Sequence, residues 1–180
     1  NYADYLLDNS NIRCIAVDGA NQKWFGTDNG VYLISDDCNT QIYHFNTENS
    51  PLISNTIHSI AINNNAGKVY FATDKGLCSF NNGIVSPNAE MTKDNVYAYP
   101  NPVKPDYTGK INIVGLSFNA NIKIVSTNGT LINEGRSAGG SYSWDGCDLN
   151  GKKVASGIYM VETATESGEK GIVCKIAIIR

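Results

Sequence analysis

The chain has 180 residues, of which 42% are hydrophobic and 17% are charged, a composition that excludes a disordered segment and a coiled coil. The 14 Lys and Arg face 17 Asp and Glu, so the net charge of −3 lacks the basic excess that a nucleic-acid-binding surface needs. No apolar run approaches the roughly 18 residues of a membrane-spanning helix. The 23 Asn and 17 Gly make the chain rich in turn-forming residues, which predicts an all-β protein.

The first residue is Asn1 and no basic-then-apolar leader follows it, so we expect either a removed signal peptide or a piece of a longer protein. Five cysteines are scattered without a C-x-x-C pair, which argues against a zinc ribbon or a redox motif. An odd number also prevents complete disulfide pairing within one chain. We expect these cysteines to be small buried apolar residues. They are Cys14, Cys38, Cys78, Cys147 and Cys174.

The first half of the chain contains an internal repeat of about 45 residues. Ile15 matches Ile60 at a shift of 45, and Gly30 matches Gly76 at a shift of 46. The extra residue falls in the polar turn 63–67, where an insertion costs little. The repeat is predicted to contain a short strand, a polar turn, an aromatic-rich strand, a tight turn, a third strand and a fourth apolar segment.

The tight turns are Asp28-Asn29-Gly30 and Asp74-Lys75-Gly76, in which glycine is expected to take a positive φ. A four-stranded unit of about 45 residues is typical of a β-propeller blade. Two such blades fit before residue 87, whereas propellers close with roughly four to eight. Residues 1–86 are therefore predicted to be the C-terminal part of a larger propeller.

The periodicity stops after residue 86, and residues 87–94 are predicted to form a polar linker. Residues 95–180 contain about seven short strands, which is typical of a small Ig-like β-sandwich. Three prolines within 100–105 predict an extended segment at a sheet edge. The pair Asn128-Gly129 predicts a hairpin whose two central residues both adopt positive φ. The final strand ends at Arg180, and we expect it to be paired because an open apolar edge promotes aggregation.

Few side chains in this sequence indicate metal binding, catalysis or modification. Asp145, Asp148 and Asn150 lack the alternation and the distal Glu of a calcium loop, so a plain turn is expected. Trp144 is expected in the sandwich core. The formal glycosylation acceptor at Asn128 is explained by the turn alone.

The two histidines, His44 and His58, are expected to be structural because no catalytic motif surrounds them. The sequence therefore predicts no catalytic residue, no metal site and no cofactor, and it favours a protein that is not an enzyme.

The repeat resembles the two-component regulator propeller repeat of Bacteroidetes-type proteins, whose pattern has an I-x-x-I-x-x-D start and a W-F-G-T core. The resemblance covers residues 11–34 and, less fully, residues 55–80, where Tyr70 and Ala72 replace Trp and Gly of the core.

The second half is similar to the FlgD-like Ig module and to the C-terminal sorting domain of the Bacteroidetes type IX secretion system. The resemblance rests on the Y-P-N-P sequence at 99–102, on W-D-G at 144–146, on Gly157-Ile158-Tyr159 and on the last strand, Lys175 to Arg180. It implies a set of sorting-motif candidates. These are Pro100, Asn101, Pro102, Gly157, Tyr159 and Lys175.

Together the two resemblances imply a non-enzymatic surface component of a type IX secretion apparatus, with residues 95–180 as its secretion signal or docking domain. They imply an exported protein at the cell surface, the outer membrane or in the periplasm. Other secretion-apparatus proteins are its expected partners, with an anionic lipopolysaccharide or a glycan as a further ligand. Two alternatives stay open: a glycan-sensing propeller ectodomain of a two-component regulator, and the C-terminal part of a secreted enzyme.

Overall fold

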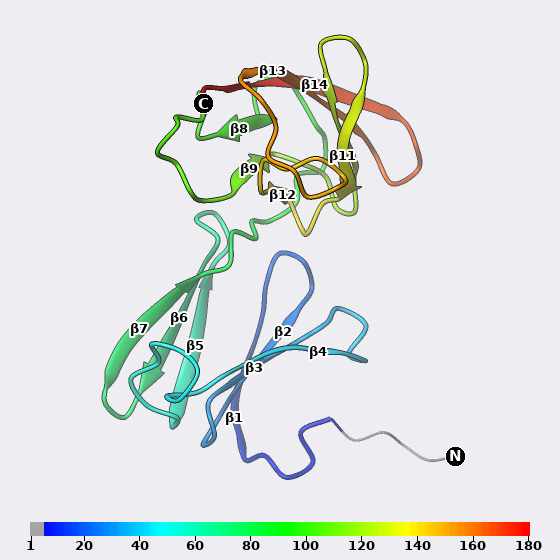
Figure 1. Cartoon of the computed structure of the whole chain (residues 1–180). Coiled ribbons are helices and arrows are strands. Elements are labelled where there is room, and N and C mark those ends of the chain that lie inside the picture. Colours follow the sequence, from blue (N-terminus) through cyan, green and yellow to red (C-terminus); the bar gives the residue numbers. More distant parts are fainter. Residues whose placement is uncertain (1–5) are drawn as a thin grey trace. The chain divides into compact units, whose positions relative to one another are not determined.

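The computed structural model describes residues 6–180, which contain fourteen β-strands and no helix (Figure 1). The chain divides into two compact units, Asn1–Ile84 and Val85–Arg180. The all-β fold is therefore confirmed. The first five residues of the expected propeller segment lie outside the described residues. No helix within 6–180 is long and apolar enough to cross a membrane.

The first unit contains two antiparallel sheets. One has four strands in the order β1-β2-β3-β4, and the other has three in the order β5-β6-β7. Each is a simple meander in which consecutive strands pair. The strands are β1 (Ile12–Val17), β2 (Lys23–Thr27), β3 (Val31–Ile34), β4 (Gln41–Phe45), β5 (Ile57–Asn63), β6 (Lys68–Thr73) and β7 (Gly76–Asn81).

The repeat detected in the sequence is also a repeat of hydrogen bonds. In the first sheet the hydroxyl of Thr27 donates to the carbonyl oxygen of Gly30 at 2.9 Å, and in the second that of Thr73 donates to Gly76 at 2.8 Å. Gly30 has φ 101° and Gly76 has φ 127°, so both glycines take the predicted positive φ. The two tight turns are confirmed.

The expectation of four strands in each repeat is wrong for the second one. After β7, the N–H groups of Asn82 and Gly83 both donate to the carbonyl oxygen of Gly67, which turns the chain away from the sheet. Val85, the first residue of the second unit, then forms a parallel bridge with Gly139 of the same unit. It does not pair with β7. The second sheet therefore ends at β7.

The two sheets of the first unit share an apolar core centred on Trp24. The Trp24 ring is fully buried and lies 6.4 Å from Phe45, 5.8 Å from Phe71 and 6.1 Å from Phe80, measured between ring centroids. Because Phe71 and Phe80 belong to the second sheet, these aromatic contacts connect the two repeats.

Asp18 supports this core from the turn that follows β1. Its Oδ1 accepts hydrogen bonds from the backbone N–H of Ala20 at 2.9 Å and of Gln22 at 3.1 Å, and its Oδ2 accepts one from Trp24 Nε1 at 3.0 Å. Only 5% of Asp18 is exposed. The equivalent residue of the second repeat, Asn63, accepts from two backbone N–H groups of its own turn. With a further hydrogen bond of 3.4 Å from Asn82 Nδ2, the Asp18 carboxylate satisfies four donors.

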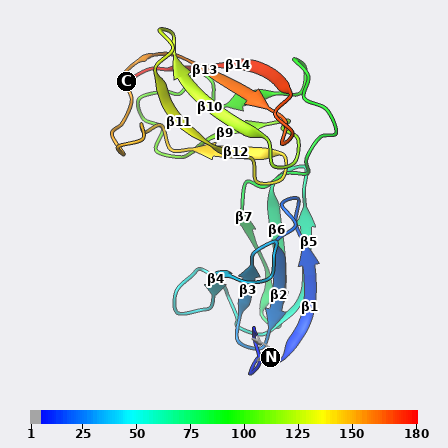
Figure 2. The ribbon, with the colours of Figure 1, turned by 90° about the vertical axis from the view of Figure 1, so that its right-hand side faces the viewer.

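The second unit is a β-sandwich of seven strands, as expected for an Ig-like fold. A four-stranded sheet, β11-β10-β13-β14, faces a three-stranded sheet, β12-β9-β8 (Figure 2). The strands are β8 (Tyr97–Tyr99), β9 (Ile111–Val114), β10 (Asn121–Ser126), β11 (Leu131–Arg136), β12 (Ser141–Trp144), β13 (Gly157–Ala164) and β14 (Lys170–Ile178).

Both sheets contribute to a single core in which Trp144, Ile113, Ile124 and Ile176 are almost completely buried. Trp144 Nε1 donates to the carbonyl oxygen of Cys147 at 2.8 Å, so its polar group is satisfied inside the core. The expectation for Trp144 is confirmed.

Several finer expectations need correction. The segment 87–94 is packed onto the sandwich, because the N–H of Asn88 donates to Leu116 O at 2.9 Å and Met91 contacts the core. In the hairpin after β10 only Gly129 has a positive φ, of 84°. Its N–H donates to Ser126 O, and Ser126 N–H donates to Thr130 O, so the loop has three residues with glycine in the last place.

The expectation that the cysteines are buried is also wrong. All five are free, Cys38 is exposed and the other four are half-buried.

The acidic turn, by contrast, has the predicted form. Asp145 accepts from Cys147 N–H, and Asp148 accepts from the N–H groups of Asn150 and Lys152, all at 2.9 Å. These carboxylates therefore close their own turns.

We expect Asp18→Ala to lower the free energy of unfolding of the first unit by about 2–4 kcal/mol, because it leaves a buried indole N–H and two backbone N–H groups without an acceptor. Asp18→Asn should cost less, since the amide oxygen can still accept from the turn. Urea unfolding followed by fluorescence of the Trp24 environment, in a Trp144→Phe background, measures the difference.

The matched control is Asp28→Ala, because Asp28 is exposed and makes no side-chain hydrogen bond within residues 6–180. Its effect should stay below about 0.5 kcal/mol. Equal destabilisation by the two alanine variants would contradict the role assigned to Asp18.

Candidate functional site

The sorting-motif candidates come together at one end of the four-stranded sheet of the second unit. Three segments lie side by side there: residues 101–103, the end of β14 and the beginning of β13. Gly157 is paired with Ile178, and Tyr159 with Ile176. On the other side of β14, Val103 forms a parallel bridge with Ile178. We refer to the segment 101–103 as the edge clasp.

Asn101 attaches the edge clasp through its side chain. Its Nδ2 donates to the carbonyl oxygen of Lys175 at 2.8 Å, and its Oδ1 accepts from the N–H of Ala177 at 3.0 Å. A carboxamide carries one N–H donor and one C=O acceptor side by side, as a peptide group does. Asn101 therefore satisfies the outer edge of β14 as a neighbouring strand would.

Val103 continues the same pairing with its backbone. Its N–H donates to Ala177 O at 2.8 Å, and its carbonyl oxygen accepts from Ile179 N–H at 2.9 Å. Its side chain is buried in the sandwich core. The last third of β14 thus has partners on both sides, as the sequence expectation for the final strand requires.

Pro102 in the clasp and Pro100 just before it are typical of a segment outside a regular ladder. The peptide bonds Tyr99–Pro100 and Asn101–Pro102 are both cis. Pro100 is half-buried and Pro102 is exposed. Since neither proline can donate a backbone hydrogen bond, pairing with β14 falls to Asn101 and Val103.

Tyr159 packs inward from β13. Its ring contacts the edge of Trp144, with 5.8 Å between the ring centroids and an interplanar angle of 63°. Its hydroxyl donates to Ala155 O at 2.9 Å. Tyr159 is thus a core residue whose polar end is satisfied by the loop before β13.

A glycine at 157 is expected where a close backbone approach would make a Cβ clash, but the structure shows no such approach. A Cβ at this position would contact only Tyr159 Cε2, at an ordinary 3.8 Å, and the backbone has no positive φ. Nothing in the structure requires glycine here.

Lys175 differs from the other candidates. Its backbone carbonyl is bound by Asn101, but its side chain is exposed and makes no hydrogen bond or ion pair with the described part of the chain.

The neighbours of Lys175 in β14, Cys174 and Ile176, face inward. Burial raises the pKa of the Cys174 thiol to about 11. This thiol stays protonated at neutral pH and is a poor nucleophile.

The end of the chain is held by contacts that the sequence analysis did not anticipate. The N–H of Arg180 donates to Ser156 Oγ at 2.8 Å, and its Nε donates to Val154 O at 3.1 Å. No local pattern reveals these pairs, because 24 and 26 residues separate their members.

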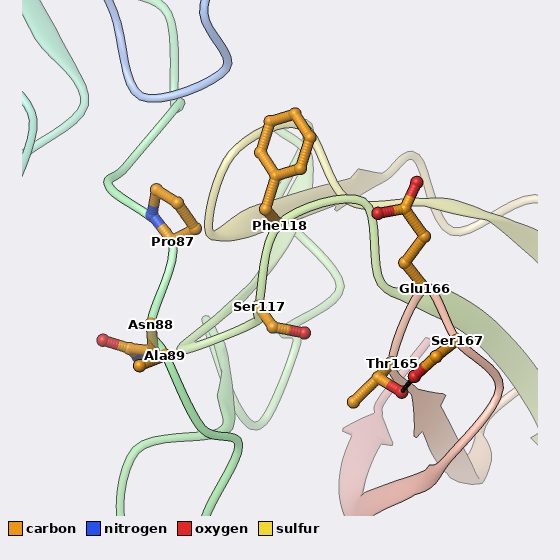
Figure 3. Close-up of a pocket in the computed structure, with 8 residues that line it drawn as sticks. All are labelled: Pro87, Asn88, Ala89, Ser117, Phe118, Thr165, Glu166 and Ser167. Atoms are coloured by element: carbon orange, nitrogen blue, oxygen red, sulfur yellow. Dashed lines mark hydrogen bonds between the residues drawn. The ribbon is translucent and has the colours of Figure 1, made fainter.

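A hollow of about 720 Å³ lies elsewhere on the second unit (Figure 3). Hydroxyl and amide groups, one carboxylate and the exposed ring of Phe118 line it. Ser117 Oγ is buried and has no hydrogen-bond partner among the described residues. The lining residues are Pro87, Asn88, Ala89, Ser117, Phe118, Thr165, Glu166 and Ser167. Their three separate chain segments explain why the sequence did not predict this hollow.

The histidines have local structural contacts. The His44 ring stacks on Tyr32 with 4.0 Å between centroids, and its Nε2 lies 2.8 Å from Asn29 O. His58 is exposed on β5. Within residues 6–180, no group of three or more His, Cys, Asp or Glu side chains is placed to hold a metal ion.

Comparison with known proteins agrees with this geometry. Residues 97–178 match the family described as the secretion system C-terminal sorting domain. This range runs from the first strand of the sandwich to the end of β14, so it includes all the candidate residues. No curated protein sequence matches the chain.

Among solved structures, the chain is similar to PorZ of Porphyromonas gingivalis, described as an essential bacterial surface component of the type-IX secretion system. The identity is 38% and the TM-score 0.63, over 98% of this chain and 24% of PorZ. The chain thus spans about a quarter of the length of PorZ.

Two further structures are much less similar. Dimeric latent PorU of Porphyromonas gingivalis matches with 18% identity and a TM-score of 0.37, over 62% of this chain and 12% of PorU. The extracellular domain of a one component system from B. thetaiotaomicron matches with 13% identity and a TM-score of 0.34, over 99% of this chain and 26% of its own. Similarity this weak supports no argument about function. The resemblance to the type IX secretion system component PorZ is confirmed by sequence identity and by fold.

Proposed function

We propose that the chain is part of a non-enzymatic surface component of a type IX secretion apparatus, and that its sandwich is the secretion-signal or docking domain. The observation that carries the proposal is the match of residues 97–178 to the sorting-domain family, because this range contains all seven strands of one folded unit. The 38% identity to PorZ supports the same apparatus. An exported protein at the cell surface, with other proteins of the apparatus as partners, follows from this proposal.

Recognition would take place at the end of β14. In this region the edge clasp fixes the backbone, so a receptor would meet an ordered strand and would lose little conformational entropy on binding. Of the six candidates, Lys175 alone combines an exposed side chain with a charged group, and no other described residue engages that group. A cation held on a rigid strand is a suitable specificity element for an acidic partner surface.

The proposal of a non-enzymatic role rests on what the polar groups do. The carboxylates of Asp18, Asp145 and Asp148 accept backbone or indole hydrogen bonds, and the histidines stack or lie on a strand surface. The three carboxylates and His44 are thus occupied by structural contacts.

The chain's own hollow favours glycan binding as a second candidate function. An exposed aromatic ring beside hydroxyl groups can stack on a sugar and bind its hydroxyls. The carboxylate of Glu166 disfavours an anionic glycan at this position. The proposed ligand is therefore a neutral oligosaccharide.

For this proposed function, the first prediction tests the export role of β14. Residues 85–180 are fused to a fluorescent reporter with a periplasmic signal, in a bacterium with an active type IX system. The wild-type fusion should reach the cell surface, and Lys175→Glu should reduce surface fluorescence about tenfold, because it reverses the charge of the recognised side chain. The matched control, Lys152→Glu, changes another exposed lysine in a turn and should leave export unchanged.

Removal of residues 175–180 would be an inferior test. The truncation removes Ile176 and Ile178 from the sandwich core, so a loss of export would not separate lost recognition from unfolding. Substitution of the exposed Lys175 avoids this problem. Surface display of Lys175→Glu at the wild-type level would overturn the assigned role of β14, and retention of the wild-type fusion in the periplasm would leave docking within the apparatus as the function.

The second prediction tests the edge clasp. Asn101→Ala removes two hydrogen bonds to β14, so hydrogen exchange at the N–H of Ala177 should become about tenfold faster. Asn101→Asp should have a similar effect, because a carboxylate oxygen would then face Lys175 O. Asn150→Ala, in an exposed turn, is the control and should leave exchange at Ala177 unchanged. Unaltered exchange in Asn101→Ala would show that Val103 alone orders the strand.

The third prediction concerns the hollow. Phe118→Ala should abolish retention of the chain on immobilised neutral oligosaccharides, while its melting temperature should change little because Phe118 is 46% exposed. Tyr97→Ala, which removes another exposed aromatic ring, on β8, is the control. Equal retention of Phe118→Ala and wild type, or no retention of either, would exclude the hollow as a glycan site.

A further inference from the structure

The outer face of the four-stranded sheet of the second unit separates apolar from charged side chains. Its strands lie side by side in the order β11-β10-β13-β14 (Figure 2). Every second residue of β10, β13 and β14 belongs to the sandwich core, so the residues between them point outward. The strand register places these outward residues in rows that run across the sheet. Two adjacent rows differ in character.

One row is apolar at its centre, where Val125 of β10 is paired with Met160 of β13. Leu131 of β11 and Lys175 of β14 extend the row at its two ends. Ile158, two residues from Met160 on the same face, is 45% exposed. The sandwich core does not include these apolar side chains. Adjacent apolar side chains on the outside of a sheet are typical of an interaction surface.

The neighbouring row is charged. Lys123 of β10 is paired with Glu162 of β13, and Glu134 of β11 is paired with Lys123 on its other side. All three side chains are exposed, and the sign of the charge alternates along the row. At the centre of the face, a cation and an anion therefore lie side by side next to the apolar row.

A hollow of about 390 Å³ adjoins the charged row. Its lining includes the small residues Ala164 and Gly168 as well as the two central charges. The lining residues are Asn121, Lys123, Glu162, Thr163, Ala164, Gly168 and Val173. The face thus has room for long charged side chains of another molecule beside its own.

A two-fold rotation makes this face complementary to itself. Two copies can face each other across an axis that is parallel to the strands and lies between β10 and β13. The β10 strand of one copy then lies over β13 of the other, and each row keeps its position along the strands. Lys123 faces Glu162 of the second copy, and Glu162 faces Lys123 of the second copy. In the next row Val125 faces Met160 of the second copy.

We propose that the outer face of β11-β10-β13-β14 binds a second copy of the chain. The apolar row forms the centre of the contact, and two reciprocal pairs between Lys123 and Glu162 lie beside it. Charge complementarity selects this occupant, because the rotation exchanges the central cation and anion. A partner surface with charges of one sign would repel one of them.

The packing distance agrees with this arrangement. Facing sheets lie about 10 Å apart, so the outward side chains of the two copies interdigitate. The hollow allows water to remain with the four charges, which lowers the cost of removing them from solvent. Lys175 lies on the outer strand β14, so its ammonium group stays at the rim of the contact.

Sedimentation velocity of the complete 180-residue chain, over about a hundredfold range of concentration, tests the proposal. The wild-type chain should dimerise. Lys123→Glu and Glu162→Lys should each weaken the dimer about tenfold, because each places two pairs of like charges across the contact. Met160→Lys should weaken it as strongly by removing the apolar centre. Leu149→Lys, which changes an exposed apolar residue in a turn, is the matched control and should have no effect.

Mixing the two charge variants gives the sharpest test. At the centre of the face, Lys123→Glu leaves two acidic groups and Glu162→Lys leaves two basic groups. An equimolar mixture should therefore form a mixed dimer about as stable as that of the wild type, although each variant alone associates weakly. The chain with both substitutions should also dimerise, because its charges only exchange places. Circular dichroism checks that every variant keeps the fold.

The proposal does not depend on the export function, because the association is measured with the purified chain alone. A wild-type chain that stays monomeric over the whole range of concentration would overturn it. Association that Met160→Lys leaves intact would also overturn it, since another surface would then hold the copies together. A mixture that associates no better than its separate components would exclude the reciprocal charge pairs and with them the proposed arrangement.

Discussion

The sandwich depends on one short segment that belongs to both of its sheets. Residues 97–99 pair with β9 as the edge strand β8, and two residues later Asn101 and Val103 bind the outer edge of β14 in the opposite sheet. Because a side-chain carboxamide has the same donor and acceptor as a peptide group, Asn101 can begin this pairing where the neighbouring prolines cannot donate. The segment thereby closes one side of the sandwich and fixes the end of β14, the strand on which the proposed recognition depends.

The two units differ in whether the outer edge of their last strand is covered. In the second unit the end of β14 is covered by residues from the same chain, and Ser156 and Val154 bind the terminal Arg180. Among residues 6–180 no strand lies outside β7, although the same repeat provides β4 for its equivalent, β3. An unpaired backbone edge exposes donors and acceptors that favour association. The outer edge at the end of β14 is closed to such pairing, whereas the outer edge of β7 is open to it.

Much of the fold could be predicted from local patterns, and what could not be predicted depends on contacts between distant residues. The tight turns at Gly30 and Gly76 follow from adjacent residues, and the burial of Trp144 follows from a strand pattern. Asn101 and Ala177 are 76 residues apart, so no local signal shows that they meet. The chain turns away from the sheet after Asn81 because Gly67 O accepts two hydrogen bonds from the following residues. Asp18 supports the core because Trp24 Nε1 lies within hydrogen-bond distance of its carboxylate. The hairpin loop was assigned the wrong type because Asn128-Gly129 fits both a two-residue and a three-residue loop.

The motif residues at the candidate site were assigned by resemblance, and the structure separates their possible roles. Asn101 and Tyr159 are explained by the sandwich itself, since one pairs with β14 and the other packs on Trp144. Their occurrence in a motif therefore requires no receptor. Gly157 and Lys175 are different, because no internal contact of the described chain needs a glycine at 157 or a charge at 175. The two positions lie in adjacent strands at the same end of the sheet, with Gly157 paired to Ile178. An exposed glycine lets another backbone approach closely, and an exposed lysine can bind an acidic group. The part of the motif that the fold does not explain is thus the part that an external partner can use.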